Sequence, residues 1–504
     1  MRSSARRLGL QLGLGLGLGI VTALAACGGG DGTDDSPATP DGSASGDAPV
    51  GTPDADTRDL LVRLDSLPGV TASEFACRTT FLPAERCFQL AVTQPVDHAV
   101  TGGATFQQDV TLASGDLARP MVAYTTGYDN YWYEYPSEPA QLLQANQISL
   151  EYRFFGSSRP EPADWTKLTI EQAAADEHHV IELLKSIYQA PWITSGGSKG
   201  GMTASYHMRF WPDDVAGTAP YVAPLSFGAA DPRYAGFLDS DGTPACRQAL
   251  RDVEVELLKP ARFDAMKARA IANQGSRTFT RIQIGPAVEG GISGIEWAFW
   301  QYRGVADCGS VPAVTATDAA MWAFLKDTSN PLDYDDTSLA RFEPYYYQTL
   351  AELGDVDGGG DYLQGLTRYT AADYDGIFPA GVARPTLRTE AMTDIDQWVQ
   401  TSGHHMLFVY GEYDPYSAGH YTLGAATDSA ELFVPQGTHN DGIANLVPAD
   451  QTTALAKLAA WTGVTPDPSQ LRTLRARRQA PPTVRVPALP RALRLARARL
   501  AAER

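Results

Sequence analysis

The sequence predicts an α/β fold in which a doubly wound, mostly parallel sheet is interrupted by a largely helical insertion. From about residue 105 to 224, short apolar segments typical of buried strands alternate with segments of helical period. The alternation stops between about 228 and 400, where helical stretches and aromatic residues dominate, and it returns over 405–439. With 504 residues, 43% hydrophobic and 20% charged, the chain is long enough to bury a large core.

The first part of the alternation contains three predicted strands and one long helix. The apolar runs 121–128 and 147–156 predict two strands, and the short run 192–194 predicts a third. Before the third strand, Thr169 lies three residues ahead of Gln172, which is the spacing of a capping box. An apolar face at helical period follows, so a helix is expected to begin there.

A glycine-rich turn, 195–201, follows the third strand and leads into a predicted helix at 202–210 and a predicted strand at 215–224. After the insertion, the runs 405–414 and 431–439 predict the last strands. We therefore expect the helical cap to lie between the strand that enters the glycine-rich turn and the strand at 405–414.

Six segments are expected along the chain. They are a lipoprotein signal peptide (1–26), a disordered acidic tether (27–57), the first part of the sheet domain (58–227), the helical cap (228–400), the second part of the sheet domain (401–464) and an Arg/Pro-rich tail (465–504).

The N-terminus has the features of an export signal. Basic residues precede an apolar run, and the run ends at Leu24-Ala25-Ala26-Cys27, which resembles a bacterial lipobox. That resemblance implies cleavage before Cys27, acylation of this cysteine and attachment to a membrane of the cell envelope. The alternative is ordinary secretion, with Cys27 merely near the cleavage site.

The charge of the chain is unevenly distributed. The whole chain has a net charge of −19, but residues 27–464 contain 57 acidic and 27 basic residues, a net charge of −30. Such a field repels phosphate backbones and excludes nucleic acid as a partner of the main body. The tail 465–504 is basic, and it could fold back on the acidic body, touch an anionic surface or remain solvated; we expect it to be dispensable for chemistry.

Four cysteines remain after Cys27, and an exported protein is expected to oxidise them. Three pairings are possible. We favour Cys77 with Cys87, which closes a short loop, and Cys246 with Cys308, which both lie in the insertion. A metal site is the alternative, but no C-x-x-C occurs and the histidines lie elsewhere, so no metal and no cofactor are expected.

The glycine-rich turn contains Gly196-x-Ser198-x-Gly200 between a predicted strand and a predicted helix. This context is typical of a nucleophile elbow, in which a sharp turn lifts the serine hydroxyl above the edge of the sheet. The backbone N–H of Lys199, at the start of the helix, would face a developing oxyanion. The alternative is a flexible glycine turn with no chemical role.

A nucleophilic serine needs a base and an orienting acid, which in this topology follow it in the chain in the order acid and then histidine. His439 follows the last strand, and Asp414 follows the strand before it, so these two are the predicted partners of Ser198. His420 is the competing base and Glu412 the competing acid. A simple Asp-Pro turn is the alternative role for Asp414.

Four blocks of the sequence resemble a known family. They are LEYRFFGSSRPEPADW (150–165), LTIEQAAADEHH (168–179), GGSKGGMTASYH (196–207) and PDDVAGTAPYVAP (212–224). Together they are similar to the secreted bacterial prolyl tri- and tetrapeptidyl aminopeptidases, serine peptidases related to prolyl carboxypeptidase and dipeptidyl peptidase II. Over about residues 70–460, the resemblance implies an α/β-hydrolase fold with a helical cap, a triad at Ser198, Asp414 and His439, and release of short peptides from free N-termini, often after proline.

An enzyme that measures from a free N-terminus must hold an ammonium group with acids. The candidates are Glu151, Asp129 and Glu296, and the alternative for Glu151 is a salt bridge to Arg153 or Arg159. The loop that contains Asp129 also supplies Tyr128, whose backbone is the candidate for the second oxyanion donor.

The sequence is also compatible with two other function classes. An esterase or lipase would use the same three catalytic residues, but its substrate channel should be apolar, whereas the main body here is strongly acidic. A non-catalytic surface-binding lipoprotein on the same scaffold would not need Ser198, Asp414 and His439 in the order found. The sequence therefore favours a peptidase acting on peptides with a free N-terminus.

Overall fold

The computed structural model describes residues 56–77, 80–83, 85–130, 136–478, 486 and 490–502. The predicted signal peptide, Cys27 and nearly all of the predicted tether lie outside the described residues. Within the described ranges, every helix is too short or too polar to cross a lipid bilayer.

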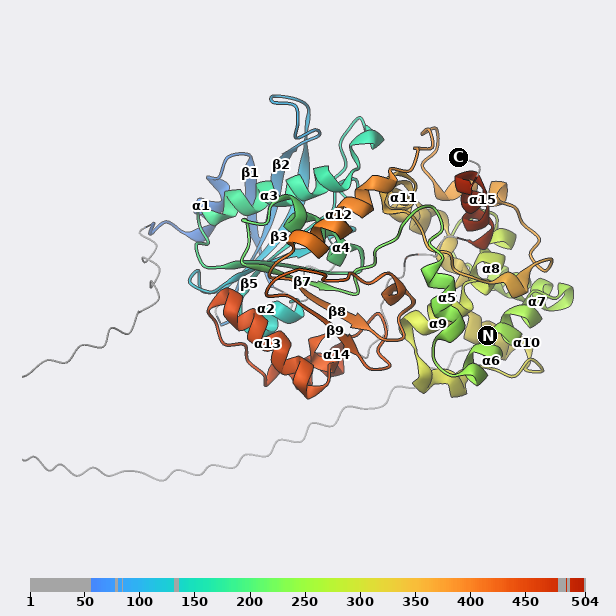
Figure 1. Ribbon diagram of the computed structural model, residues 1–504. Helices are drawn as coiled ribbons and strands as arrows, with labels where there is room; N and C mark the ends of the chain where they lie inside the picture. Colours follow the sequence, from blue (N-terminus) through green and yellow to red (C-terminus); the bar gives the residue numbers. More distant parts are fainter. Residues whose placement is uncertain are drawn as a thin grey trace, which may run out of the picture. The chain divides into compact units, whose positions relative to one another are not determined.

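The described residues form one nine-stranded sheet with the order β1-β2-β3-β5-β4-β6-β7-β8-β9 (Figure 1). The pairs from β1 to β5 along this order are antiparallel, and all pairs from β5 to β9 are parallel. The strands are β1 (Val70–Phe75), β2 (Arg86–Pro95), β3 (Thr105–Ser114), β4 (Met121–Thr125), β5 (Asn146–Leu150), β6 (Trp192–Gly197), β7 (Gly217–Tyr221), β8 (Leu407–Gly411) and β9 (Ala430–Val434). The predicted doubly wound, mostly parallel sheet is confirmed, and the fold is that of an α/β-hydrolase.

Helices cover both faces of the sheet, because successive side chains of a strand point to opposite faces. In β8, Phe408 and Tyr410 join the core below α3, α4 and α12, whereas Leu407 and Val409 join the core below α2, α13 and α14. Figure 1 shows these two helical layers on either side of the strands. The helices are α1 (Leu60–Asp65), α2 (Glu138–Leu143), α3 (Ile170–Lys185), α4 (Lys199–Phe210), α12 (Thr389–Ser402), α13 (Pro448–Thr462) and α14 (Gln470–Arg478), with the short turns η1 (Trp165–Lys167), η7 (Pro415–Gly419) and η8 (Ile443–Asn445).

The predicted helical cap lies between β7 and β8 and has its own core, to which Leu250, Trp300 and Met321 contribute fully buried side chains. The last helix before β8, α12, instead buries its apolar face in the core of the sheet domain. The cap contains α5 (Arg233–Ser240), α6 (Pro244–Leu257), α7 (Pro260–Asn273), α8 (Ile284–Ile292), α9 (Ile295–Tyr302), α10 (Asp318–Thr328) and α11 (Asp336–Gln348), with η2 (Val305–Ser310), η3 (Pro331–Tyr334), the π-helix η4 (Thr349–Leu353), η5 (Asp361–Leu363) and η6 (Ala371–Ile377).

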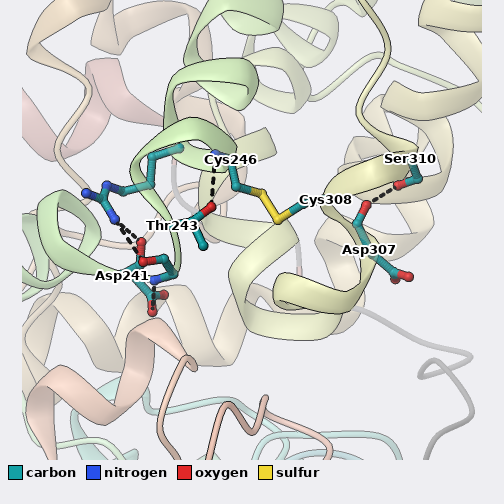
Figure 2. The surroundings of a disulfide bond; sticks show 8 residues. Asp241, Thr243, Cys246, Asp307, Cys308 and Ser310 are labelled. Carbon is teal, nitrogen blue, oxygen red and sulfur yellow. Dashed lines mark hydrogen bonds between the residues drawn. A yellow bond between two sulfur atoms is a disulfide. The ribbon is translucent and has the colours of Figure 1, made fainter.

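Both predicted disulfides are confirmed. Cys77 bonds to Cys87 beside β2, and Cys246 bonds to Cys308 across 62 residues of the cap. Figure 2 shows the second bond joining the start of α6 to η2, with Asp241 and Thr243 in the preceding loop. A disulfide that closes a long loop lowers the entropy of the unfolded chain, so this bond is expected to stabilise the cap.

The basic tail is not a solvated extension, so that alternative is wrong. Leu474 of α14 is buried in the core of the sheet domain, and Leu493 of α15 (Arg491–Ala502) is buried against the cap. Arg497 of α15 donates to Asp355 over 2.8 Å and to the carbonyl oxygen of Thr349 over 2.9 Å. The tail therefore folds back on the acidic body, held by buried leucines and by the pair of Arg497 with the buried Asp355.

Candidate active site

The predicted nucleophile lies in a strained turn between β6 and α4. Ser198 has φ +55° and ψ −123°, a backbone conformation that residues other than glycine rarely adopt. Its N–H donates to the carbonyl oxygen of Tyr221 in β7 over 2.9 Å, and its own carbonyl oxygen accepts from Met202 in α4. The turn is thus held from both sides at the carboxyl edge of the sheet.

Two glycines in this turn are required by close packing. A Cβ on Gly196 would lie 2.5 Å from the carbonyl carbon of Gly200, and a Cβ on Gly200 would overlap the carbonyl oxygen of Thr125 in β4. The Thr125 hydroxyl also donates to the carbonyl oxygen of Gly200 over 2.5 Å. Side chains at these positions would push β4, β6 and α4 apart, which explains the G-x-S-x-G spacing.

The structure brings together the predicted acid and the predicted base. Asp414 Oδ2 lies 2.6 Å from Nδ1 of His439, and Asp414 Oδ1 accepts from the N–H of Tyr416 over 3.1 Å. The Asp414 side chain is fully buried, and that of His439 is 10% exposed. The carboxylate therefore orients the imidazole, and the other ring nitrogen, Nε2, is available to accept a proton.

The loops with Asp414 and His439 follow β8 and β9, which are parallel to β6, so all three candidates lie at the same edge of the sheet. Among the described residues, no hydrogen bond joins the Ser198 hydroxyl to His439. Such contacts are often long in ligand-free enzymes and tighten when substrate binds.

The cap supplies contacts to His439 that the sequence did not indicate. The carbonyl oxygen of Gln301 in α9 accepts from the backbone N–H of His439 over 2.8 Å. The ring of Tyr302, also in α9, lies 6.0 Å from the imidazole between centroids, and the ring of Tyr416, in the η7 turn of the sheet domain, lies 5.4 Å from it. The Gln301 contact uses a backbone carbonyl, so no residue type in the sequence could have indicated it.

The competing base and acid lie elsewhere. His420 pairs with Glu431, and that hydrogen bond raises the pKa of the imidazole. Glu412 accepts from the backbone N–H of Gln436 over 2.7 Å and does not contact His439. The geometry around His439 therefore favours Asp414 over Glu412.

The two candidate oxyanion donors come from segments in direct contact. Lys199 is the first residue of α4, where backbone N–H groups have no earlier carbonyl within the helix to bind. A Cβ on Gly127 would overlap the N atom of Gly200, so the loop after β4 passes against the start of α4. The N–H of Tyr128 donates to the Thr126 hydroxyl over 3.3 Å, a long bond that an oxyanion could replace.

Glu151, a candidate ammonium ligand, already has a complete set of donors. Its Oε1 accepts from the N–H groups of Ser157 and Ser158 and from the Ser158 hydroxyl, and its Oε2 accepts from the N–H of Asn130. Burial raises the pKa of this carboxyl, and the hydrogen bonds oppose the rise. These contacts indicate that Glu151 fixes two loops, and its role in substrate binding stays a prediction.

The alternative salt bridge of Glu151 is wrong. Arg153 is fully buried and donates to Asp176 over 2.7 Å, and Arg159 donates to Glu343 over 3.2 Å. Both arginines therefore have other acidic partners.

The remaining candidate acids also have basic partners. Asp129 pairs with Arg341 of α11 over 2.6 Å, which joins the loop after β4 to the cap. Glu296 of α9 pairs with Arg251 over 2.9 Å and lies beside the buried Glu254, with the Tyr362 hydroxyl bonded to both carboxylates. Burial raises the pKa of Glu254 to about 8 and also raises that of Glu296.

In the part of the chain that the structure describes, one set of metal-ligand side chains has donor atoms within 4.8 Å of one another: Cys77, Glu85 and Cys87. Both cysteines are bonded to each other, so their thiolates are not free to bind an ion.

A comparison with protein families decides the class of the chain. Residues 53–488 match the family described as PS-10 peptidase S37. The chain belongs to this family. It is therefore a serine peptidase on an α/β-hydrolase fold, as the sequence resemblance implied.

Among curated proteins, the chain is similar to the prolyl tri/tetrapeptidyl aminopeptidase of Streptomyces mobaraensis, with 38% identity over 437 residues, 85% of this chain and 90% of that protein. It is also similar to the lysosomal Pro-X carboxypeptidase of Mus musculus, with 32% identity over 152 residues, 26% of this chain and 31% of that protein.

Among solved structures, a proline iminopeptidase of Mycobacterium smegmatis aligns with 74% of this chain and 98% of its own, with 14% identity and a TM-score of 0.32. A homoserine O-acetyltransferase of Staphylococcus aureus aligns with 83% of this chain and 98% of its own, with 12% identity and a TM-score of 0.33.

Proposed function

We propose that this peptidase is an exported aminopeptidase that releases short peptides, of three or four residues and often ending in proline, from free N-termini. The observation that carries the proposal is the buried Asp414–His439 pair at the same sheet edge as the strained Ser198 turn. The similarity to the Streptomyces aminopeptidase supports the substrate class.

In the proposed reaction, His439 Nε2 takes the proton of the Ser198 hydroxyl as Oγ attacks the scissile carbonyl carbon. The N–H groups of Lys199 and Tyr128 bind the oxyanion that forms. His439 then gives its proton to the leaving amine, and an acyl ester remains on Ser198. A water molecule, deprotonated by His439, releases the short peptide and restores the serine.

The strongly acidic body supports selection of a cationic N-terminus. Of the three candidate acids, Glu296 lies in the helix whose Gln301 carbonyl binds His439, and it shares Arg251 with the buried Glu254. Burial raises the pKa of both carboxyls, so a bound ammonium would favour their ionised forms. Glu296 also lies five residues before Gln301, about 7.5 Å along α9 from the carbonyl that holds His439. An extended tripeptide spans about 10 Å, which is compatible with this separation.

The test is a panel of chromogenic peptides with free or acetylated N-termini and with proline or alanine at the cleaved bond, beside a short-chain acyl ester. Loss of a charge-assisted contact is expected to lower kcat/KM of acetylated tripeptides about 30- to 1000-fold. Equal turnover of free and acetylated peptides would instead indicate an endopeptidase. Turnover of the ester alone would indicate an esterase.

Two variants complete this test. Ser198→Ala should abolish turnover and labelling by a fluorophosphonate probe while leaving thermal unfolding nearly unchanged, because it removes a nucleophile and no packing. Glu296→Gln should remove most of the preference for the free amine and change kcat/KM on acetylated peptides little. The substitution and the acetylation each break the same ion pair between enzyme and substrate. A preference that survives Glu296→Gln would move the anchor to Glu151, Asp129 or another acid.

Export and anchoring through a lipidated Cys27 belong to the same proposal. The lipobox-like sequence before Cys27 and the two disulfides, which suit an oxidising compartment, support it. Cells fed an alkyne fatty acid should label the wild-type protein in the membrane fraction and leave Cys27→Ala unlabelled. An unlabelled wild-type protein in the medium would indicate ordinary secretion.

A further inference from the structure

The side chain of Lys199, whose backbone N–H is a candidate oxyanion donor, is buried. It is 2% exposed, and among the described residues its Nζ atom has no hydrogen-bond partner. Burying an amine without such a partner is costly, and an apolar side chain of similar length would avoid that cost. Packing alone therefore does not explain a lysine at this position.

Three aromatic rings surround the Lys199 amine. Nζ lies 3.1 Å from the ring centroid of Tyr152, 5.5 Å from that of Phe155 and 5.8 Å from that of Tyr128. The rings also contact one another, with centroid distances of 5.6 Å between Tyr128 and Phe155 and 6.1 Å between Tyr152 and Phe155. A cation over aromatic faces is stabilised by the ring quadrupoles, most strongly where water is excluded.

Hydrogen bonds to other segments hold two of these rings in place. The N–H of Tyr152 donates to the carbonyl oxygen of Tyr128 over 2.9 Å, which ties the loop after β4 to the loop after β5. The Tyr152 hydroxyl accepts from Gln348 of the cap helix α11 over 2.9 Å. Burial lowers the pKa of Lys199, and the carboxylate of Glu352, in the adjoining π-helix, opposes that lowering. The Lys199 side chain therefore ends among the rings of Tyr128, Tyr152 and Phe155, which we call the box.

The box connects the two candidate oxyanion donors. One donor is the N–H of Lys199, and the other is the N–H of Tyr128, whose ring forms one wall of the box. The Lys199 side chain thus bridges from the residue that supplies the first donor to the residue that supplies the second. The contact between Gly127 and Gly200 leaves no spare room between the two segments.

We propose that the Lys199 side chain is a positioning residue that, by packing on Tyr152 and Tyr128, sets the separation of the two backbone N–H groups that bind the oxyanion. The inference rests on the proposed triad and goes beyond it, because it assigns a role to a side chain that neither accepts nor donates a proton in the reaction. Binding of the ground state should depend little on this separation, whereas binding of a tetrahedral adduct should depend on it strongly.

The test compares Lys199→Met, which keeps the length of the side chain and removes the amine, with the wild-type enzyme. We expect kcat to fall about 10- to 100-fold, with KM and the inhibition constant of the product tripeptide within about threefold. The inhibition constant of a peptide boronic acid, which forms a tetrahedral adduct with Ser198, should rise by about the same factor as kcat falls. Lys199→Arg, which retains a cation, should recover part of kcat.

The matched control is Ser205→Ala on the same helix, since the buried Ser205 hydroxyl donates to the carbonyl oxygen of Gly201 and interacts with Tyr421, not with the rings around Lys199. It should leave kcat and both inhibition constants unchanged. If Lys199→Met does not fold, Tyr152→Leu removes the nearest ring and should produce the same kcat loss. If both fold, the double variant should lose little more than either single variant, because both changes break one contact.

A Lys199→Met enzyme with kcat within about twofold of the wild type would overturn the proposal. So would a product inhibition constant that changes as much as that of the boronic acid, because that result indicates general damage to the site. If the wild-type enzyme turns over only the acyl ester, the proposed aminopeptidase function fails, but the Lys199 test still applies, since ester attack needs the same oxyanion donors.

Discussion

The carboxyl edge of the sheet and the cap bury acids in different ways. At the sheet edge, the fully buried Asp414 has an imidazole on one oxygen and a backbone N–H on the other. In the cap, burial raises the pKa of several carboxyls, namely those of Asp241, Glu254, Glu289, Glu296 and Asp355. At the sheet edge, Asp414 therefore has a partner on each oxygen, and Glu151 has donors on both of its oxygens. In the cap, Asp241 has a buried oxygen without a partner among the described residues, so the integrity of the cap depends more on the protonation and pairing of its acids.

The largest expected effect tests the sheet edge. Asp414→Asn should lower kcat by about 10⁴, because an amide at this position stabilises the wrong imidazole tautomer. The matched control is Glu412→Gln, two residues earlier in the same loop, which should leave kcat within about twofold. Steady-state kinetics on a free tripeptide substrate checks both, and a damaging Glu412→Gln beside an active Asp414→Asn would reverse the assignment.

The second effect tests the pairing of acids in the cap. Arg497→Ala removes the cation that is hydrogen-bonded to the buried Asp355 and should lower the free energy of unfolding by about 3–5 kcal/mol. Arg491→Ala is the control, since its partner Asp361 is fully exposed, and it should cost about 1 kcal/mol or less. Denaturant unfolding of the two variants measures this contrast, and equal losses would mean that packing of α15 matters more than the buried charge pair.

The third effect tests the backbone packing of the serine turn. Gly200→Ala forces β4 and α4 apart and should cost about 2–3 kcal/mol of stability, together with a loss of kcat. Gly236→Ala, in the cap helix α5, is the control, because nothing lies within 4 Å of the added Cβ. There, alanine should stabilise the helix by about 0.5–1 kcal/mol. A neutral Gly200→Ala would show that the turn can relax.

The smallest effect tests the pH dependence of the cap. Burial raises the pKa of Asp241 to about 8, and its Oδ2 is buried without a partner among the described residues. When the pKa of a carboxyl is higher in the folded than in the unfolded state, its neutral form stabilises the folded state. This stabilisation is complete below the unfolded pKa, near 4, and it is lost as the pH rises toward the folded pKa, about 8. Asp241→Asn should therefore gain about 1–2 kcal/mol over the wild type between pH 5 and 8.

Unfolding titrations at several pH values measure this gain. The exposed Asp239, in the last turn of α5 and two residues before Asp241, is the control, and Asp239→Asn should follow the pH dependence of the wild type. A constant difference between Asp241→Asn and the wild type across this range would show that Asp241 remains charged throughout.

The sheet edge could be predicted in detail because its constraints are local. Close backbone contacts impose the spacing of Gly196, Ser198 and Gly200. The parallel strands β8 and β9 end at the same edge, which brings Asp414 and His439 there. The antiparallel β1 and β2 were not predicted, although β2 has the alternating burial of a strand with one covered face. That signal was present in the sequence before residue 105.

The cap could not be predicted beyond its helical character, because its contacts join distant segments. Gln301 reaches His439 through a backbone carbonyl, which no side chain reveals. Glu151 was expected near substrate because it follows a strand, but a turn of the chain brings the Ser157 and Ser158 N–H groups onto it. The charge of the tail was evident, whereas the buried position of its partner Asp355 was not.

The docking of α15 has a consequence for how the cap unfolds. Arg497 donates to Asp355 and to the carbonyl oxygen of Thr349, and Leu493 of the same helix is buried against the cap. Detaching α15 would therefore expose a buried carboxylate and apolar surface together. We expect α15 and this part of the cap to unfold as one cooperative unit.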